Sequence, residues 1–376
     1  MDFSLSDEQL ELQNLAKQIL LDQTSNEHMR EIDQREERFD EKLWRDLGEA
    51  GLLGIGIGEV HGGMALGYES LCLLVELVGY TVAPVPVIPS LVSAALPIDH
   101  FGNDEQKGRL LPGVVNGDAV LSAGLIEPMN EEPAAPNTTA VQDGSDWLLR
   151  GTKTCVPFAN RASRILVSAK HESGVGVYLL DPEADGVTLA RQESTSGEPQ
   201  FEVTLSDARV SGDDVLVGPD GGARAMRWIT TRTAAATCAM AVGVAERMTR
   251  MTADYTAERE QFGVKIATFQ AVGQRAANCY IDTECLRLVS QQAVSLLNQG
   301  RDADDEVMIA KIWVGDVSHR VSHAAQHLHG GIGVDRDYPL FRYCLWAKQL
   351  EMTLGSSARL TSELGATIAR EYSQQA

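Results

Sequence analysis

The sequence predicts an α+β protein in which a helical segment, a β domain and a longer helical segment follow one another. Apolar residues recur at the three- and four-residue steps of amphipathic helices before about residue 118 and after about residue 221. Between these segments, short apolar runs are bounded by Gly, Pro, Asp, Asn and Ser, as in strands. We therefore expect three domains, at residues 1–118, 119–220 and 221–376.

Capping residues mark the helices of the first segment. Ser6-Asp7-Glu8-Gln9 has the form of a capping box, which places a helix start here. Asp40 can cap a second helix that ends near Gly51. Two further helices are expected at 68–79 and 103–115.

The middle segment contains short runs at ~8–12-residue spacing, which favours a sandwich or barrel. Asp143-Gly144 and Asp185-Gly186 supply the residues of tight turns. The expected strands are 119–126, 138–142, 147–150, 163–169, 175–180, 188–190, 201–205 and 215–217.

The last segment predicts four long helices packed as a bundle. They are expected at 226–260, from Phe269 to the stop at Gly300, at 305–329 and at 340–371. A long bundle that is apolar on several faces usually buries one of them against another chain, so we expect an oligomer.

Composition and charge exclude several function classes. Apolar residues make up 44% and charged residues 23% of the 376, which is typical of globular proteins. Lys and Arg number 32 against 53 Asp and Glu, a formal net charge of −21. Binding to nucleic acid or to an anionic membrane depends on Lys and Arg, so neither partner is expected.

The six cysteines form no CxxC pair, which argues against a zinc ribbon and a disulfide framework. The N-terminus carries charges where a signal peptide is apolar, and no apolar run approaches the ~20 residues of a spanning helix. We therefore expect a cytoplasmic protein.

Two glycine- or histidine-rich patterns have ordinary interpretations. Gly54-Ile-Gly56-Ile-Gly58 follows a helix rather than a strand, so we interpret it as a turn and not a dinucleotide loop. His319, His323 and His327 stand at i, i+4 and i+8 of one helix. They are consistent with a metal site, an exposed polar stripe or a ligand-facing helix end, and no metal is expected because no ligand of another type is obviously placed.

Two further motifs suggest a nucleotide ligand. Arg259-Glu260-Gln261-Phe262-Gly263 precedes Ile266 and Phe269-Gln270. An Arg beside a Phe-Gly corner offers a guanidinium fork for a diphosphate and an apolar wall for an adenine. His329-Gly330-Gly331-Ile332-Gly333 predicts a left-handed glycine cap at a helix end, and its consecutive glycines let the backbone approach a ligand closely.

Together these motifs resemble the acyl-CoA dehydrogenase family. The resemblance extends to Phe3–Gln9, to the Trp-x-x-Leu-x-x-Ala-Gly-Leu-Leu-Gly pattern from Trp44, and to Val210–Gly218, and it covers essentially the whole chain. It implies an N-terminal helical domain, a middle β-barrel or sandwich domain and a C-terminal four-helix bundle. It also implies FAD as cofactor and α,β-dehydrogenation of acyl-CoA thioesters.

In the family each FAD lies between two chains: one holds the isoalloxazine ring, and its neighbour holds the adenosine diphosphate. The resemblance places the neighbour's half of the site on motifs that this chain retains. The implied cofactor-binding residues are Arg259, Gln261, Phe262, Ile266, Phe269, Gln270, His327, Gly330 and Gly331.

The family's catalytic base is missing by the same comparison. A Glu takes the α-proton of the thioester, either from a Tyr-Glu-Gly-Thr-like turn or from the first helix of the bundle. Leu354 and Thr233 occupy these two positions here, so no catalytic residue is assigned. Glu351 lies one turn before Leu354 and is an alternative base, although it points about 60° away on the helix.

The flavin cradle departs from the family pattern as well. Ile126–Pro133 lacks the Thr and the Gly-Ser amides that serve the flavin, and Glu131 and Glu132 would repel a diphosphate. In Lys153–Phe158, Cys155 replaces the ring that stacks on the flavin, and Pro157 replaces a Thr and removes a backbone donor.

Three hypotheses follow. The chain most resembles the non-catalytic subunit of actinobacterial heterotetrameric (α2β2) steroid side-chain acyl-CoA dehydrogenases, which would complete FAD sites on a homologous partner that holds the catalytic Glu. Alternatively, it is a self-sufficient homotetramer that uses Glu351, or a non-enzymatic scaffold.

Overall fold

The structure, a computed structural model, describes residues 3–375, and its contacts divide the chain into two compact units. The helical unit takes the described residues up to Met29, Cys72–Ala83 and those from Ala234 onward. The sheet unit takes Arg30–Leu71 and Pro84–Thr233. The three domains expected from the sequence stay a prediction.

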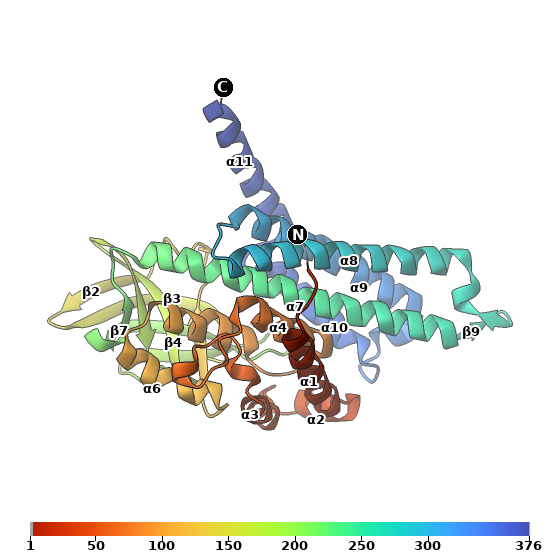
Figure 1. The fold of residues 1–376 in the computed structure, drawn as a ribbon, viewed down its shortest axis with the longest axis horizontal. Helices are drawn as coiled ribbons and strands as arrows, with labels where there is room; N and C mark the ends of the chain where they lie inside the picture. The colour runs from red at the N-terminus through yellow and green to blue at the C-terminus, as the bar shows by residue number, and fades with distance from the viewer. Residues whose placement is uncertain (1–2, 376) are drawn as a thin grey trace. The chain divides into compact units, whose positions relative to one another are not determined.

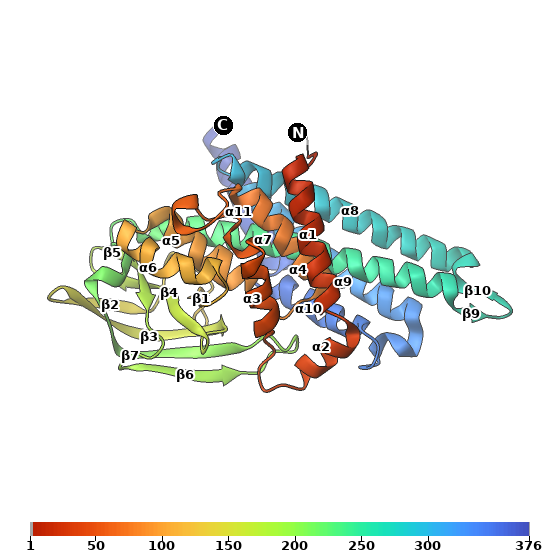
Figure 2. The same cartoon turned by 60° about the horizontal axis from the view of Figure 1, so that its bottom comes forward.

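The sheet unit is built on one eight-stranded sheet, whose labelled strands can be followed in Figure 2. Seven strands follow the order β6-β7-β3-β2-β4-β5-β8, and β1 pairs in parallel with β4. All eight predicted runs form strands. Their bounds are β1 Val120–Gly124, β2 Thr139–Asp143, β3 Asp146–Pro157, β4 Ala162–His171, β5 Gly174–Leu180, β6 Val187–Gln192, β7 Gln200–Val210 and β8 Val215–Val217.

Helices accompany this sheet. Asp40 caps α3 (Glu41–Glu49) by accepting from the amide of Leu43, as predicted, and Asn103 and Gln106 form a capping box on α6 (Asp104–Val115). The interpretation of Gly54-Ile-Gly56-Ile-Gly58 as a turn holds in part: Gly54 ends a 3-10 helix and Gly56 lies in a turn, whereas Gly58 is extended. The sequence missed α2 (Asn26–Asp33) and the apolar segment of π-helix Val87–Ala95 and α5 (Leu96–Phe101).

One proline of that apolar segment lies where an amide donor is dispensable. Pro89 is in the first turn of the π-helix, where the N–H has no intrahelical acceptor, and the π-helix then continues directly into α5. The π-helix packs on β1, and the hydroxyl of Ser90 accepts the amide of Leu121 at 3.1 Å.

The helical unit is a bundle of long helices. Figure 1 shows α7, α8 and α9 side by side. Gly243 on α7 lets α4 approach, because a Cβ there would lie 1.9 Å from the carbonyl oxygen of Glu76. Ser6 and Gln9 form the predicted capping box on α1. The bounds are α1 Asp7–Gln23, α4 Gly67–Thr81, α7 Gly222–Glu258, α8 Gln270–Asn298, α9 Asp304–His329, α10 Leu340–Met352 and α11 Ser357–Gln375.

The prediction of one helix over 340–371 is wrong, because the chain breaks between α10 and α11. Leu354 and Gly355 have φ values of 56° and 107°, which a helix does not allow. The buried Lys311 stabilises the break, since its Nζ donates at 3.0 Å to the carbonyls of both Glu351 and Gly355. Among the described residues, no helix is long and apolar enough to cross a membrane.

Candidate functional site: the hairpin end of the helical bundle

The Arg-x-x-Phe-Gly motif forms a small hairpin between α7 and α8. Its strands are β9 (Glu260–Gln261) and β10 (Val264–Lys265), and Phe262 and Gly263 turn the chain with φ values of 56° and 79°. Positive φ at both turn residues matches the twist of a tight hairpin. Figure 1 shows β9 projecting beyond the ends of α7 and α8.

The hairpin presents aromatic surface and charge to solvent. The side chain of Phe262 is 92% exposed and meets Phe269 edge to face, with the ring centroids 6.1 Å apart. Arg259, Gln261 and Gln270 are exposed as well. Val264 is exposed too, so the hairpin carries several exposed apolar side chains, two of them in contact. An exposed apolar patch marks a binding surface, so this end of the bundle is the candidate site.

Backbone hydrogen bonds fix the position of Arg259. Its amide donates to the carbonyl of Tyr255 at 2.8 Å, and its carbonyl accepts from Ile266 at 2.9 Å. The first bond continues the helical hydrogen bonding of α7 by one residue, and the second closes the base of the hairpin. The guanidinium therefore leaves the helix at a defined point.

An aromatic cluster joins the ends of α7 and α9. Tyr255 stacks on the buried ring of His329, with centroids 4.4 Å apart and planes at 21°. The Nδ1 of His329 lies 2.8 Å from the carbonyl of Ala325, so Nδ1 carries the hydrogen and Nε2 accepts from Tyr338 at 3.1 Å. Burial lowers the pKa of His329 although that carbonyl opposes the shift.

This stack brings the two sequence motifs to one end of the bundle. Arg259 follows Tyr255 by one helical turn, and Gly330 follows His329 directly. Gly330 has φ 65° and ψ −142°, which only glycine adopts readily. The predicted left-handed cap is therefore wrong in detail, because this ψ directs the chain into the 3-10 turn Gly330–Val334.

The glycines leave the backbone open to a ligand. A Cβ at Gly330 or Gly331 would meet no heavy atom within 4 Å, and both residues are exposed. Crowding within the chain does not require glycine at these positions. A ligand or a second chain can therefore approach the backbone closely.

The histidine stripe of α9 is exposed along its length. The rings of His319 and His323 lie 4.4 Å apart, and the Nδ1 of His327 lies 3.2 Å from Nη1 of Arg275 on α8. The described residues contain no group of three His, Cys, Asp or Glu side chains placed to hold a metal ion.

The two family base positions hold a Leu and a Thr in defined surroundings. Leu354 lies half-buried in the break between α10 and α11. Glu351 precedes it on α10, and its Oε2 pairs with Nζ of Lys348 at 2.6 Å. In the sheet unit, Thr233 is buried and its hydroxyl donates to the carbonyl of Ile229 at 2.9 Å.

The segment at the flavin-cradle position is anchored by a buried ion pair. Nζ of Lys153 lies 2.7 Å from Oε1 of Glu127, and their side chains are 1% and 5% exposed. The amide of Thr138 also donates to this carboxylate, at 2.9 Å. Burial alone raises the pKa of Glu127, but Lys153 and Thr138 together lower it to about 2.

The amide at Cys155 already has an acceptor within the chain. Cys155 lies in a bulge of β3 with φ 53°, and its N–H donates to Oε1 of Gln192 at 2.8 Å. Gln192 also donates to the hydroxyl of Thr154 at 2.9 Å. The polar groups of Thr154, Cys155 and Gln192 are therefore bonded to one another within the chain.

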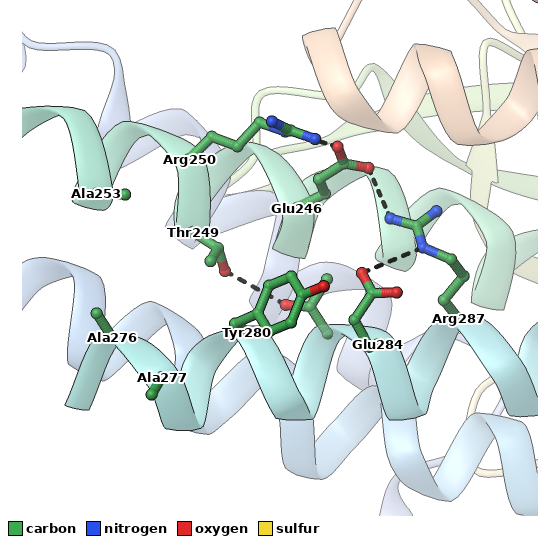
Figure 3. Close-up of a pocket in the computed structure, with 10 residues that line it drawn as sticks. Glu246, Thr249, Arg250, Ala253, Ala276, Ala277, Tyr280, Glu284 and Arg287 are labelled. Carbon is green, nitrogen blue, oxygen red and sulfur yellow. Dashed lines mark hydrogen bonds and ion pairs between the residues drawn. The ribbon is translucent and has the colours of Figure 1, made fainter. Parts of the chain in front are cut away.

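A separate cleft of about 640 Å³ lies between α7 and α8. Figure 3 shows that ion pairs line it: Glu246 bonds both Arg250 and Arg287, and Glu284 lies 3.5 Å from Arg287. Exposed Tyr280 and small alanines complete the walls. No residue predicted for the site lines this cleft.

Sequence reasoning missed the residues that assemble the site. Tyr255 and Tyr338 enclose His329, and Arg275 contacts His327. Their spacing in the sequence carried no signal for these contacts, which depend on how α7, α8 and α9 pack. The only indication in the sequence was that Tyr255 precedes Arg259 by one helical turn, which places both at the same end of α7.

Family models match both helical parts of the chain. The acyl-CoA dehydrogenase N-terminal domain matches residues 6–118, and the C-terminal domain matches residues 220–369. FadE27, an acyl-CoA dehydrogenase of Mycobacterium tuberculosis, is 36% identical, with 98% of this chain and 99% of the relative aligned. FadE28 of the same organism is 32% identical, over 86% and 91%.

Solved structures agree in fold. A single-substitution variant of the Tcur3481-Tcur3483 steroid ACAD has a TM-score of 0.92 and 42% identity, with 98% of this chain and 100% of the other covered. The ChsE4-ChsE5 complex from Mycobacterium tuberculosis has a TM-score of 0.92 and 35% identity, covering 98% and 99%. The chain belongs to the acyl-CoA dehydrogenase family.

Proposed function

We propose that this chain is one subunit of a heteromeric, FAD-dependent acyl-CoA dehydrogenase. It contributes the adenosine-diphosphate half of FAD sites whose flavin cradle and catalytic Glu belong to a homologous partner chain. The substrate is proposed to be a steroid side-chain CoA thioester. Two similar solved structures support this assignment, since one is named a steroid ACAD and the other a complex of two different subunits.

The residues present fit the nucleotide half of FAD. The guanidinium of Arg259 can bind a diphosphate with two parallel hydrogen bonds. The exposed ring of Phe262 and its neighbour Phe269 offer an apolar wall for adenine. The open backbone at Gly330 and Gly331 allows a close approach. FAD, when bound, supplies the acceptor for the substrate's β-hydride.

The remaining predicted residues complete this surface. Ile266 is half-buried at the base of the hairpin, and the side chains of Gln261 and Gln270 are exposed. Nε2 of Gln261 donates to the carbonyl of Glu260 at 2.8 Å, which leaves its second N–H and its oxygen for a ligand. An amide both donates and accepts, so each can bind a ribose hydroxyl or a phosphate oxygen. His327 adds a ring donor near the glycines.

The flavin half of a site fits this chain poorly. The amide of Cys155 is already bonded to Gln192, and Pro157 has no amide hydrogen. The exposed Glu131 and Glu132 would repel a phosphate. We infer that the partner supplies the cradle.

Proton abstraction also fits this chain poorly. Neither Leu354 nor Thr233 can take the α-proton of a thioester near neutral pH. Glu351 stays the alternative base, but its pairing with Lys348 favours a structural role. The single observation that carries the proposal is this asymmetry: the bundle exposes the aromatic and glycine motifs proposed to bind the nucleotide, whereas the cradle and base positions lack the groups that their roles require.

The test is Arg259→Ala in the complex that co-purifies with the homologous partner. We expect the variant to assemble normally and to lose most of its FAD on gel filtration. Arg301→Ala, which removes an exposed Arg just beyond the opposite end of α8, is the matched control and should keep its flavin. Unchanged flavin in Arg259→Ala would favour the scaffold alternative instead.

Assays of this chain purified alone test the alternative that it is a self-sufficient enzyme. We expect it to be FAD-poor and inactive. Normal acyl-CoA oxidation by the chain alone, abolished by Glu351→Gln, would establish the self-sufficient enzyme and refute the proposal.

A further inference from the structure

The contact between Arg275 and His327 determines which ring nitrogen of His327 carries the hydrogen. Nη1 of Arg275 lies 3.2 Å from Nδ1 of His327. A guanidinium has only donors, so Nδ1 must accept. With Nδ1 accepting, Nε2 carries the hydrogen and is left as a donor.

The charge of Arg275 is not neutralised by this partner. The bond to His327 uses one of the five N–H donors of a guanidinium, and a neutral imidazole brings no negative charge. Arg320 provides the contrast on the same two helices. Both of its bonds, at 2.8 Å, go to the carboxylate of Asp282, which neutralises it.

The pair lies at the end of α9, close in sequence to the exposed glycines. His327 lies one turn before Gly330, where α9 ends. The carbonyl end of a helix carries a partial negative charge, which opposes a phosphate. A diphosphate approaching Gly330 and Gly331 therefore needs positive charge from elsewhere, and Arg275 on α8 supplies it at this helix end.

We propose that Arg275 and His327 act as a pair that binds the FAD diphosphate, in addition to Arg259. Arg275 contributes charge and donors, and it holds His327 in the tautomer whose Nε2–H donates to a phosphate oxygen. This inference rests on the proposed function, because the ligand is the nucleotide half of FAD.

The experiment compares Arg275→Met with Arg320→Met in the complex with the homologous partner. Flavin is removed, and the dissociation constants for FAD and for riboflavin are measured by flavin fluorescence. Arg275→Met should weaken FAD binding about tenfold, equivalent to ~1.4 kcal/mol. Riboflavin has no phosphate, so its binding should not change. Arg320→Met removes an exposed cross-helix arginine of the same pair of helices and should bind both like the wild type.

Two further variants test the division of roles. His327→Gln keeps an acceptor and a donor and should stay near the wild type, whereas His327→Ala should weaken FAD binding. Arg275→Gln replaces Arg275→Met if the latter fails to assemble, with the same expected loss.

FAD binding by Arg275→Met within twofold of the wild type would overturn the inference. If Arg259→Ala nevertheless loses its flavin, only this inference fails. If Arg259→Ala keeps its flavin too, the proposed function fails with it.

Discussion

Replacing Lys153 by Met should destabilise the sheet unit strongly. Lys153 and Glu127 are almost fully buried, 2.7 Å apart, and the substitution leaves a buried carboxylate without its cation. Such a loss costs about 3–5 kcal/mol. Thr138 still donates to the carboxylate, so we expect the lower value, about 3 kcal/mol. For a unit of roughly 190 residues, that lowers Tm by about 6–12 °C.

Thermal unfolding followed by circular dichroism measures this effect. The matched control is Arg150→Met on the same strand, β3, because Arg150 pairs with Asp207 in the open, with side chains 69% and 47% exposed. Exposed pairs contribute at most about 1 kcal/mol. The double variant Lys153→Met with Glu127→Gln removes both charges and should recover part of the loss. A Tm for Lys153→Met no lower than that of Arg150→Met would refute the reasoning.

The same pair predicts a pH dependence. Burial raises the pKa of Glu127, but Lys153 and Thr138 outweigh it and hold the pKa at about 2, below the ordinary 4.5. A lowered carboxyl pKa stabilises the fold above the unfolded value and loses that contribution as pH falls toward 2. In Lys153→Met the buried carboxyl protonates more easily. The difference in Tm between Lys153→Met and the wild type should therefore become smaller as the pH is lowered from 7 to about 4.

Two further predictions concern the helical unit. Arg287→Met should lower the free energy of unfolding, measured in urea, by about 2–4 kcal/mol, because it leaves the mostly buried Glu76 and Glu246 without their cation. The control is Arg250→Met, which removes a more exposed partner of Glu246 and should lower that free energy by less than about 1 kcal/mol. Lys311→Met should make the break between α10 and α11 more sensitive to limited proteolysis, because two carbonyls there lose their buried donor; a digestion rate equal to that of the wild type would contradict this role.

Local signals in the sequence predicted most of the fold. The capping residues Ser6 and Asp40 placed helix starts correctly, since an N-cap depends on residues three positions apart. The strand runs were found because turn residues separate them. The resemblance placed a turn at Leu354, but the helix prediction missed the break because apolar spacing continues across it. The donor that stabilises the break, Lys311, lies 40 residues before Glu351 in the chain.

The candidate site was predicted in part. A corner at Phe262 and Gly263 was expected from the motif, but the two short strands that make it a hairpin were not. The binding roles of Arg259 and Phe262 stay a proposal. The stack of Tyr255 on His329 and the contact of Arg275 with His327 could not be predicted, because both join different helices. Exposed arginines on helices are common. Arg275 differs from the others only because the packing of α8 against α9 brings it to His327.

The most direct test of the central claim is the number of flavins per chain. FAD is released by denaturation and counted against the two polypeptides, in the complex and in this chain purified alone. The account predicts one FAD for every two chains in the complex and almost none in the single chain. One FAD per chain in the single polypeptide would contradict it.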